Sequence, residues 1–320
     1  MSYLTSDPNQ TENTDTIIRP PYFFISGFID IPHMKYYYVF LCFVYIISLV
    51  NNQVMILPSS PKYIAVFNLA FTDMCGSTAL VPKLLDTFLF SRQLISYNQC
   101  LASLFFIFLF LTMQSFNLTI LSSDRLVAIC CPLRYHMVVT HRSMFQLTGA
   151  AWMFAGFMVL LGVCLITRLS FCRSLVINSY FCDHGPLFRL ASPCSDVVPN
   201  TVISYLGPCI VLYFPMVFII SSYICITHAL FTITLVRAVK TCTSHLILVA
   251  IFYLPINFTN FLHSIIPTNA RIINLSLTSV LPPMLNPIIY VLKTEEFKES
   301  AKKLLSKRVA QRAVAPVQST

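Results

Sequence analysis

Residues 101–123 read LASLFFIFLFLTMQSFNLTILSS and contain no Asp, Glu, Lys or Arg. A helix needs about 20 mostly apolar residues to cross the hydrocarbon core of a bilayer, so these 23 residues are long enough. The apolar residues form a continuous run, whereas the strands of a membrane β-barrel alternate between apolar and polar residues. The stretch is therefore predicted to be a membrane-spanning helix.

Six further windows of the chain are similarly long and apolar, and of these only 63–85 contains charged residues, Asp73 and Lys83. The window 197–236 has 40 residues without Asp, Glu, Lys or Arg. A helix of that length measures about 60 Å, so we expect it to project beyond the bilayer. With residues 101–123, seven membrane-spanning helices are predicted, the other six being 36–57, 63–85, 143–167, 197–236, 246–262 and 272–292.

The composition of the whole chain agrees with this assignment. Of its 320 residues, 56% are hydrophobic and only 10% are charged, whereas a soluble domain carries about 25% charged residues. These values exclude a disordered chain, a nucleic-acid-binding domain and an ordinary cytosolic enzyme. Seven spans with short loops occupy about 250 to 300 residues, which leaves no room for a second domain. Residues 1–20 are polar and lack the apolar core of a cleavable signal.

Lysine and arginine are distributed unevenly between the two sides of the membrane. With the C-terminus in the cytoplasm, the inner segments carry 13 of these residues and the outer segments carry 7, which is the bias expected of a cytoplasmic side. We therefore expect an extracellular segment (1–33), a seven-helix bundle (34–292) and a cytoplasmic segment (293–320). Asn9-Gln10-Thr11 is a glycosylation sequon on the outer side, so Asn9 is expected to be glycosylated.

Four of the 12 cysteines fall at or beyond the predicted outer surface. The outer face is an oxidising environment, so these cysteines are expected to form two disulfides. Three pairings are possible for four cysteines, and the spacing does not choose between them. Free or buried thiols are the alternative. The four residues are Cys100, Cys172, Cys182 and Cys194.

Two positions carry charge where a membrane span makes charge costly. Asp73 lies near the middle of the second span, and an intramembrane carboxylate is by default functional. The alternative is a neutral carboxyl that is hydrogen-bonded within the bundle. The pair Asp124-Arg125 lies at the inner end of the third span, where it is either functional or an interfacial anchor.

Pro215, Pro255 and Pro287 lie within the last three spans. A proline frees one carbonyl and kinks the helix, which lipid tolerates only where neighbouring groups satisfy that carbonyl. Three bent helices suit a switch or a transporter better than an inert anchor.

Sequence motifs of catalysis and of metal binding are absent. The chain has no HExxH motif and no glycine-rich phosphate loop, and its Cys and His residues lack the spacing of a zinc site. We therefore predict that the chain is not an enzyme and has no cofactor and no metal.

Several motifs resemble those of the olfactory receptors, which are rhodopsin-like (class A) G-protein-coupled receptors. Residues 121–135 read LSSDRLVAICCPLRY and are similar to the family's MAYDRYVAICxPLxY. Residues 237–246, RAVKTCTSHL, resemble KAxxTCxSHL, and residues 283–290, PMLNPIIY, resemble PxLNPxIY. Shorter matches are VPKLL (81–85), YFCD (180–183) and CSD (194–196). The matches occur in order from about residue 52 to 300, and KTCTSHL is specific to olfactory receptors.

The resemblance implies an all-α membrane fold, with seven transmembrane helices, the N-terminus outside and a short amphipathic eighth helix (293–308) inside. It implies an odorant receptor in the plasma membrane, with the cilia of olfactory sensory neurons as the expected location. The implied partners are a small-molecule odorant, which binds within the bundle, and a stimulatory heterotrimeric G protein. The implied disulfides join Cys100 to Cys182 and Cys172 to Cys194.

The resemblance also assigns a switch to the inner half of the bundle. Arg125 is held by Asp124 in the inactive state and is freed toward the G protein in the active state. The remaining members of this set are Asp73, Tyr223, Asn286, Pro287 and Tyr290. The chain departs from the family pattern at Ser123 and Leu126, where tyrosines are usual, and at Gln114, where Glu is common. The loss of that carboxylate speaks against a sodium ion at Asp73.

In such receptors the ligand lies between the third, fifth, sixth and seventh helices, toward the outer side. Ile107 stands where amine receptors carry Asp, and Val280 stands where opsins carry the retinal lysine, so an amine ligand and a retinal Schiff base are disfavoured. Helical spacing from Arg125 and from the three prolines places these residues at the ligand: Ile107, Phe108, Leu111, Thr112, Gly207, Val211, Tyr253, Ile256, Asn257, Asn260 and Ser279.

Two alternatives remain at the level of sequence. A class A receptor for a lipid or a peptide shares the fold, but KTCTSHL and the extra cysteines of the outer loop argue against it. A transporter or channel is expected to show internal repeats or intramembrane charge pairs. The sequence has no evident repeat, and Asp73 has no basic residue at the same depth.

Overall fold

The computed structural model describes residues 17–27, 34–55, 63–90, 92–172, 174–233, 236–262 and 265–293. The predicted glycosylation site at Asn9 and residues 294–308 of the predicted amphipathic helix lie outside the described residues. The side chain of Tyr290 is also outside the description.

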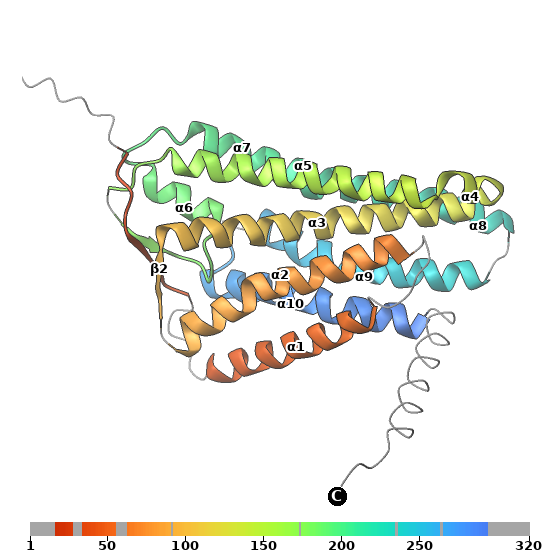
Figure 1. Cartoon of the computed structure of the whole chain (residues 1–320), viewed down its shortest axis with the longest axis horizontal. Coiled ribbons are helices and arrows are strands. Elements are labelled where there is room, and N and C mark those ends of the chain that lie inside the picture. Colours follow the sequence, from red (N-terminus) through yellow and green to blue (C-terminus); the bar gives the residue numbers. More distant parts are fainter. Residues whose placement is uncertain are drawn as a thin grey trace, which may run out of the picture.

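Seven helical spans of the described residues are long and apolar enough to cross a membrane, which confirms the predicted fold class. They run side by side, with α3 between α2 and α5 (Figure 1). The fifth span is made of α7, the π-helix η2 and α8. The spans are α1 (Met34–Met55), α2 (Tyr63–Leu89), α3 (Tyr97–Cys130), α5 (His141–Thr167), α7 (Val198–Pro208), η2 (Cys209–Tyr213), α8 (Phe214–Ile233), α9 (Val236–Phe261) and α10 (Thr268–Lys293).

Shorter elements lie at the two ends of the bundle. The strands β1 (Tyr22–Ile25), β2 (Leu94–Ser96) and β3 (Val176–Ile177) and the helix α6 (His184–Ala191) lie at one end, which we term the outer end. The turn η1 (Pro132–Arg134) and the helix α4 (Tyr135–Val138) lie at the opposite, inner end. Figure 1 shows α6 and α4 at opposite ends of α3.

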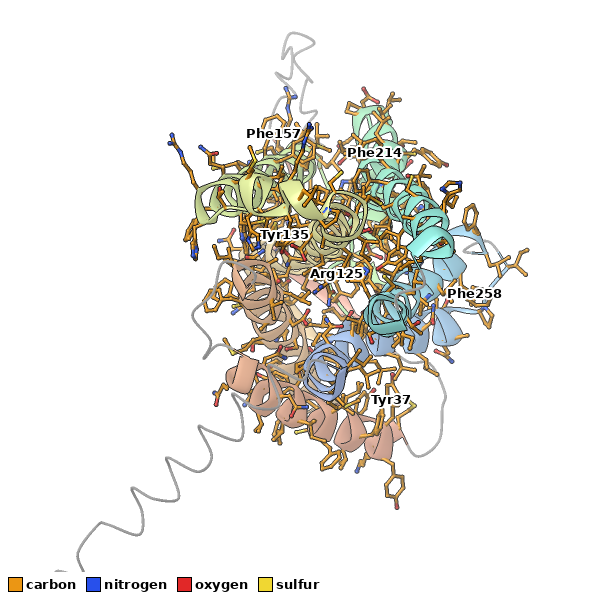
Figure 2. All side chains as sticks on the ribbon, turned by 90° about the vertical axis from the view of Figure 1, so that its right-hand side faces the viewer. Tyr37, Arg125, Tyr135, Phe157, Phe214 and Phe258 are labelled. Carbon is orange, nitrogen blue, oxygen red and sulfur yellow. A yellow bond between two sulfur atoms is a disulfide. The ribbon has the colours of Figure 1, made fainter. Side chains whose placement is uncertain are left out.

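The bundle exposes large apolar side chains around its circumference, as expected for a surface that faces lipid. Phe157, Phe214 and Phe258 are 64%, 72% and 54% exposed, and Figure 2 shows them at the periphery of the bundle. The spans of α2 and α3 are the most buried. Helix α3 thus lies at the centre of the bundle and runs from its outer end to its inner end.

Several helices are longer than the uncharged windows predicted. Helix α3 begins at Tyr97, where the side chain of Ser96 caps the helix by accepting from the backbone N–H of Gln99. It ends at Cys130 and so includes Asp124 and Arg125. The charges mark the edge of the hydrocarbon core rather than the end of the helix, because a helix can continue into the polar headgroup region.

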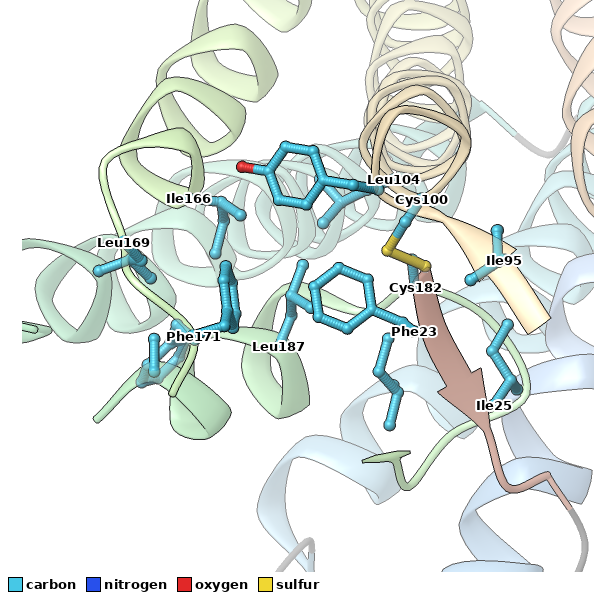
Figure 3. Packing of buried hydrophobic residues seen from close by; sticks show 14 residues of the cluster. Phe23, Ile25, Ile95, Cys100, Leu104, Ile166, Leu169, Phe171, Cys182 and Leu187 are labelled. Carbon is cyan, nitrogen blue, oxygen red and sulfur yellow. A yellow bond between two sulfur atoms is a disulfide. The ribbon is translucent and has the colours of Figure 1, made fainter. Parts of the chain in front are cut away.

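The outer end carries a three-stranded sheet that the sequence analysis did not predict. Strand β1 is central, antiparallel to β2 and parallel to β3. Phe23 and Ile25 of β1 point inward and are 0% and 2% exposed. Figure 3 shows Phe23 between Leu187 and the disulfide Cys100–Cys182. The described residues 17–27, which precede the first span, are thus part of the folded outer end.

Both disulfides that the resemblance implied are present, Cys100–Cys182 and Cys172–Cys194. The first joins the outer end of α3 to the segment between β3 and α6. The second closes a loop within the same outer region. Together they hold this region over the outer end of the bundle.

Two of the carbonyls that proline frees are bound by side chains from neighbouring helices. Pro215 lacks the N–H that would reach the carbonyl of Val211, and the Ser115 hydroxyl donates to that carbonyl at 2.6 Å. Pro287 likewise frees the carbonyl of Pro283, to which Asn52 Nδ2 donates at 2.9 Å. The bends of these helices are therefore supported by specific contacts.

Candidate functional site

A cavity of about 720 Å³ lies between the helices in the outer half of the bundle. Its walls come from α2, α3, α5, the α6 region, α7, η2, α9 and α10. Nine of the eleven predicted ligand residues line it: Ile107, Phe108, Leu111, Thr112, Gly207, Val211, Ile256, Asn260 and Ser279.

The other two predicted ligand residues, Tyr253 and Asn257, are not among the residues that line this cavity. Tyr253 is 2% exposed, and its hydroxyl lies 2.7 Å from the hydroxyl of Ser115. Asn257 Nδ2 lies 3.3 Å from Met216 Sδ, on the neighbouring helix α8. Spacing from Pro255 gave the depth of these residues but not the direction of their side chains.

The sequence analysis missed a charged group at the outer end of the cavity. The residues of this group that line the wall are Asp183, His184, Arg189 and Arg271. Arg271 Nη2 lies 3.8 Å from Asp183 Oδ2. One signal was available, because Asp183 directly follows Cys182 and the disulfide to Cys100 holds that position against α3.

Burial shifts the pKa values of two members of this group. It raises the pKa of the Asp183 carboxyl, and the guanidinium of Arg271 opposes the rise. It lowers the pKa of His184 from 6.5 to about 4, so this imidazole is neutral at physiological pH. Arg189 and Arg271 are therefore the cations of the group.

The deeper wall of the cavity contains Asp73, which is 1% exposed. Gln114 Nε2 donates to its Oδ1 at 2.7 Å, and Asn286 Nδ2 donates to its Oδ2 at 2.6 Å. The carboxyl thus joins α2 to α3 and α10. Gln114, which departs from the family pattern, thus donates a hydrogen bond to one of the two carboxyl oxygens of Asp73.

The inner end contains a second cleft, of about 260 Å³, with Arg125 on its wall. Arg125 Nε lies 3.9 Å from Asp124 Oδ2, and the Tyr135 hydroxyl donates to Asp124 Oδ1 at 2.8 Å. Burial, with Asp124 as a neighbour, raises the pKa of the Tyr135 phenol, which keeps the donor proton in place. Figure 2 shows Arg125 near the centre of the helices, with Tyr135 beside it. Sequence reasoning missed Tyr135.

Tyr223 of α8 is paired with a histidine of α9. Its hydroxyl lies 2.7 Å from Nδ1 of His245, and the two residues are 7% and 4% exposed. In this structure Tyr223 therefore contacts the sixth span.

Comparisons with known proteins agree on one family. A family model described as "Olfactory receptor" matches residues 41–308. Human olfactory receptor 10A2 is 33% identical over 294 residues, which cover 87% of this chain and 96% of that protein. Rat olfactory receptor 1f45 is 34% identical, covering 84% of this chain and 90% of that protein. Mouse olfactory receptor 1E16 is 32% identical, covering 94% and 99%.

Proposed function

Because the chain belongs to the olfactory receptor family, we propose that it binds a small organic molecule within its helix bundle and activates a stimulatory heterotrimeric G protein. It is a multi-pass protein of the plasma membrane and not an enzyme. The observation that carries the proposal is the cavity of about 720 Å³, which α3 connects to the inner cleft at Arg125. The relatives favour this function over a transporter, or a receptor for a lipid or peptide.

The cavity has the composition of a small-molecule site, which is mostly apolar with a few polar groups for orientation. Phe108, Leu111 and Ile256 supply apolar wall, and Thr112 and Ser279 supply hydroxyls. A ligand of moderate size therefore gains from burial and from one or two hydrogen bonds.

The inner end has the character of a docking surface for a protein. Leu133 of η1 and Met137 of α4 are 95% and 79% exposed beside the cleft, at the inner end, which we expect to face the cytoplasm rather than lipid. Exposed apolar side chains rimmed by polar ones mark interaction sites. Arg125 lines the adjacent cleft and is restrained by Asp124, which Tyr135 also holds.

Ligand binding acts on the inner cleft by favouring one of two arrangements of the helices. The hydroxyl of Ser115 connects α3 to the carbonyl of Val211 on the cavity wall and to Tyr253 of α9. A ligand that contacts Val211 therefore acts on the same junction that positions α9. Coupling between the two ends requires such an element with two states.

The test uses cells that express the chain with an extracellular tag, together with a cyclic-AMP reporter and a broad panel of small organic compounds. We expect a dose-dependent rise in cyclic AMP with at least one compound. Arg125→Ala, at equal surface staining, should lose this response. Absence of any response from receptor verified at the surface, or a full response in Arg125→Ala, contradicts the proposal.

A further inference from the structure

The outer end of the cavity holds two guanidinium groups against one carboxyl. Asp183 lies just before α6, Arg189 lies within α6, and Arg271 lies in the first turn of α10. All three line the cavity. Both arginines lower the pKa of Asp183, so both act on this single carboxyl. With His184 neutral, the two guanidinium groups are the cations that these residues place on the outer wall.

Arg271, on the wall of the cavity, has two donors that lack an acceptor among the described residues. Its side chain is 14% exposed, and its Nε and Nη2 atoms are buried without a hydrogen bond to any residue that the structure describes. Asp183 Oδ2 is 3.8 Å from Nη2, which is within ion-pair range but too far for a hydrogen bond. A buried donor without an acceptor is costly.

The chemistry of these two atoms selects a type of acceptor. Nε and Nη2 lie on one edge of the planar guanidinium, and their N–H groups match the two oxygens of a carboxylate. A carboxylate is also attracted electrostatically by the guanidinium groups of the outer wall. An amine, in contrast, would bring a further cation close to the guanidinium of Arg271 in a buried site, where like charges repel.

Given the proposed function, on which this inference rests, we propose that the ligand is a small organic acid whose carboxylate binds the Nε and Nη2 edge of Arg271. Its apolar body lies along Phe108, Leu111 and Ile256 of the same cavity. Asp183 competes with the ligand for Arg271. The affinity for the acid therefore rises when the charge of Asp183 is removed.

The test compares straight-chain acids, from butanoic to dodecanoic, with the methyl esters and alcohols of the same length. Binding is measured as ligand-induced thermal stabilisation of the purified receptor, and signalling is measured with the cyclic-AMP reporter. We expect the preferred acid to bind at least about tenfold more tightly than its ester. Arg271→Gln and Arg271→Lys should both lose this preference, because each removes the paired donors. Asp183→Asn should strengthen acid binding.

Arg92→Gln is the matched control, because the Arg92 side chain is 76% exposed and is not among the residues that line the cavity. This variant should keep the preference for acids. Equal binding of acid and ester, or an unchanged preference in Arg271→Gln, overturns the inference. Neutral odorants that signal while no acid binds overturn the inference but leave the proposed function intact. Acid binding that depends on Arg271 without any signal supports the inference and contradicts the G-protein step.

Discussion

Ser115 supports three helices through one hydroxyl. It bonds to the carbonyl of Val211, which Pro215 leaves without its helical donor, and to the hydroxyl of Tyr253. These contacts join α3 to η2 and α9 within the buried centre of the bundle. They explain how lipid-embedded helices tolerate the proline.

Ser115→Ala should therefore lower stability by about 1 kcal/mol, since interhelical hydrogen bonds in membranes average somewhat under that value and a buried acceptor is left unpaired. Thermal unfolding of the purified receptor measures the change. Ser103→Ala is the control, because the Ser103 hydroxyl donates to the carbonyl of Cys100 in its own helix. Equal losses in the two variants would show that the junction has no special role.

His184 makes the outer end sensitive to acid. Its pKa in the folded protein is about 4, below the ordinary value of 6.5, so the unfolded chain takes up the proton first. Its contribution to stability is complete above pH 6.5 and is lost as the pH falls toward 4. Asp183 has a raised pKa and acts in the opposite direction, so the difference between wild type and a variant isolates the histidine.

His184→Gln should flatten the fall in unfolding temperature over this pH interval. His136→Gln, at an exposed position of the inner end, should leave the wild-type profile unchanged. Parallel profiles for His184→Gln and wild type would contradict the assignment.

At the scale of single residues, the sequence predicted how deep a residue lies in the bundle better than it predicted which residues that side chain contacts. Counting along α3 from Arg125 located Ile107, Phe108, Leu111 and Thr112 on the cavity wall, because that helix has no proline to change its direction. The count from Pro255 also predicted Tyr253 and Asn257 as ligand residues, but neither of them is among the residues that line the cavity. Arg271 was missed because the sequence alone could not show that the first turn of α10 lies beside Asp183 at the outer end of the cavity.

At the scale of elements, strand β1 closes the outer end of the bundle. The Phe23 ring lies 5.2 Å from that of Phe171 in an edge-on contact, and its side chain is fully buried. The next residue, Phe24, points to the other face of the strand and is 37% exposed. Buried and exposed residues thus alternate along β1, and one face of the strand packs against the buried core of the outer end.

Phe23→Ala should destabilise the receptor by about 3 to 5 kcal/mol, as for other buried phenylalanines. The fraction of receptor at the cell surface and the unfolding temperature of the purified protein both measure this loss. Phe24→Ala removes the same group from the exposed face and should cost much less. A similar cost at the two positions would mean that the sheet is not part of the stable fold.

The sheet was not predictable because its strands have only four, three and two residues. Such short runs carry no usable periodicity, and their pairing joins segments far apart in the chain. The long helices, in contrast, follow from local composition alone. The π-helix at Cys209–Tyr213 also escaped prediction, although Pro208 and Pro215 flank it.

At the scale of the whole molecule, the number of spans follows from the bilayer acting as solvent. A predominantly apolar run of about 20 residues forms a spanning helix in lipid, so the seven windows were sufficient to predict the bundle. Which residues meet across the bundle depends on helix rotation and tilt. Composition does not determine these, and the charged outer wall of the cavity emerged only from the structure.

The central claim is that a ligand in the outer cavity activates the receptor. Gly207 lines that cavity, and a Cβ atom at this position would have no heavy atom within 4 Å. Gly207→Phe therefore adds a ring without a clash at its base and fills space that the ligand needs. A Cβ atom at Gly156 of α5 would likewise meet no heavy atom within 4 Å outside its own helix backbone, and Gly156 is not among the cavity residues, so Gly156→Phe is the matched control.

The most direct measurement is the half-maximal agonist concentration of these two variants in the cyclic-AMP assay, at equal surface staining. The account predicts that Gly207→Phe raises this concentration at least about tenfold, which corresponds to about 1.4 kcal/mol of lost binding, and that Gly156→Phe leaves it near the wild-type value. An unchanged concentration in Gly207→Phe would contradict binding in this cavity.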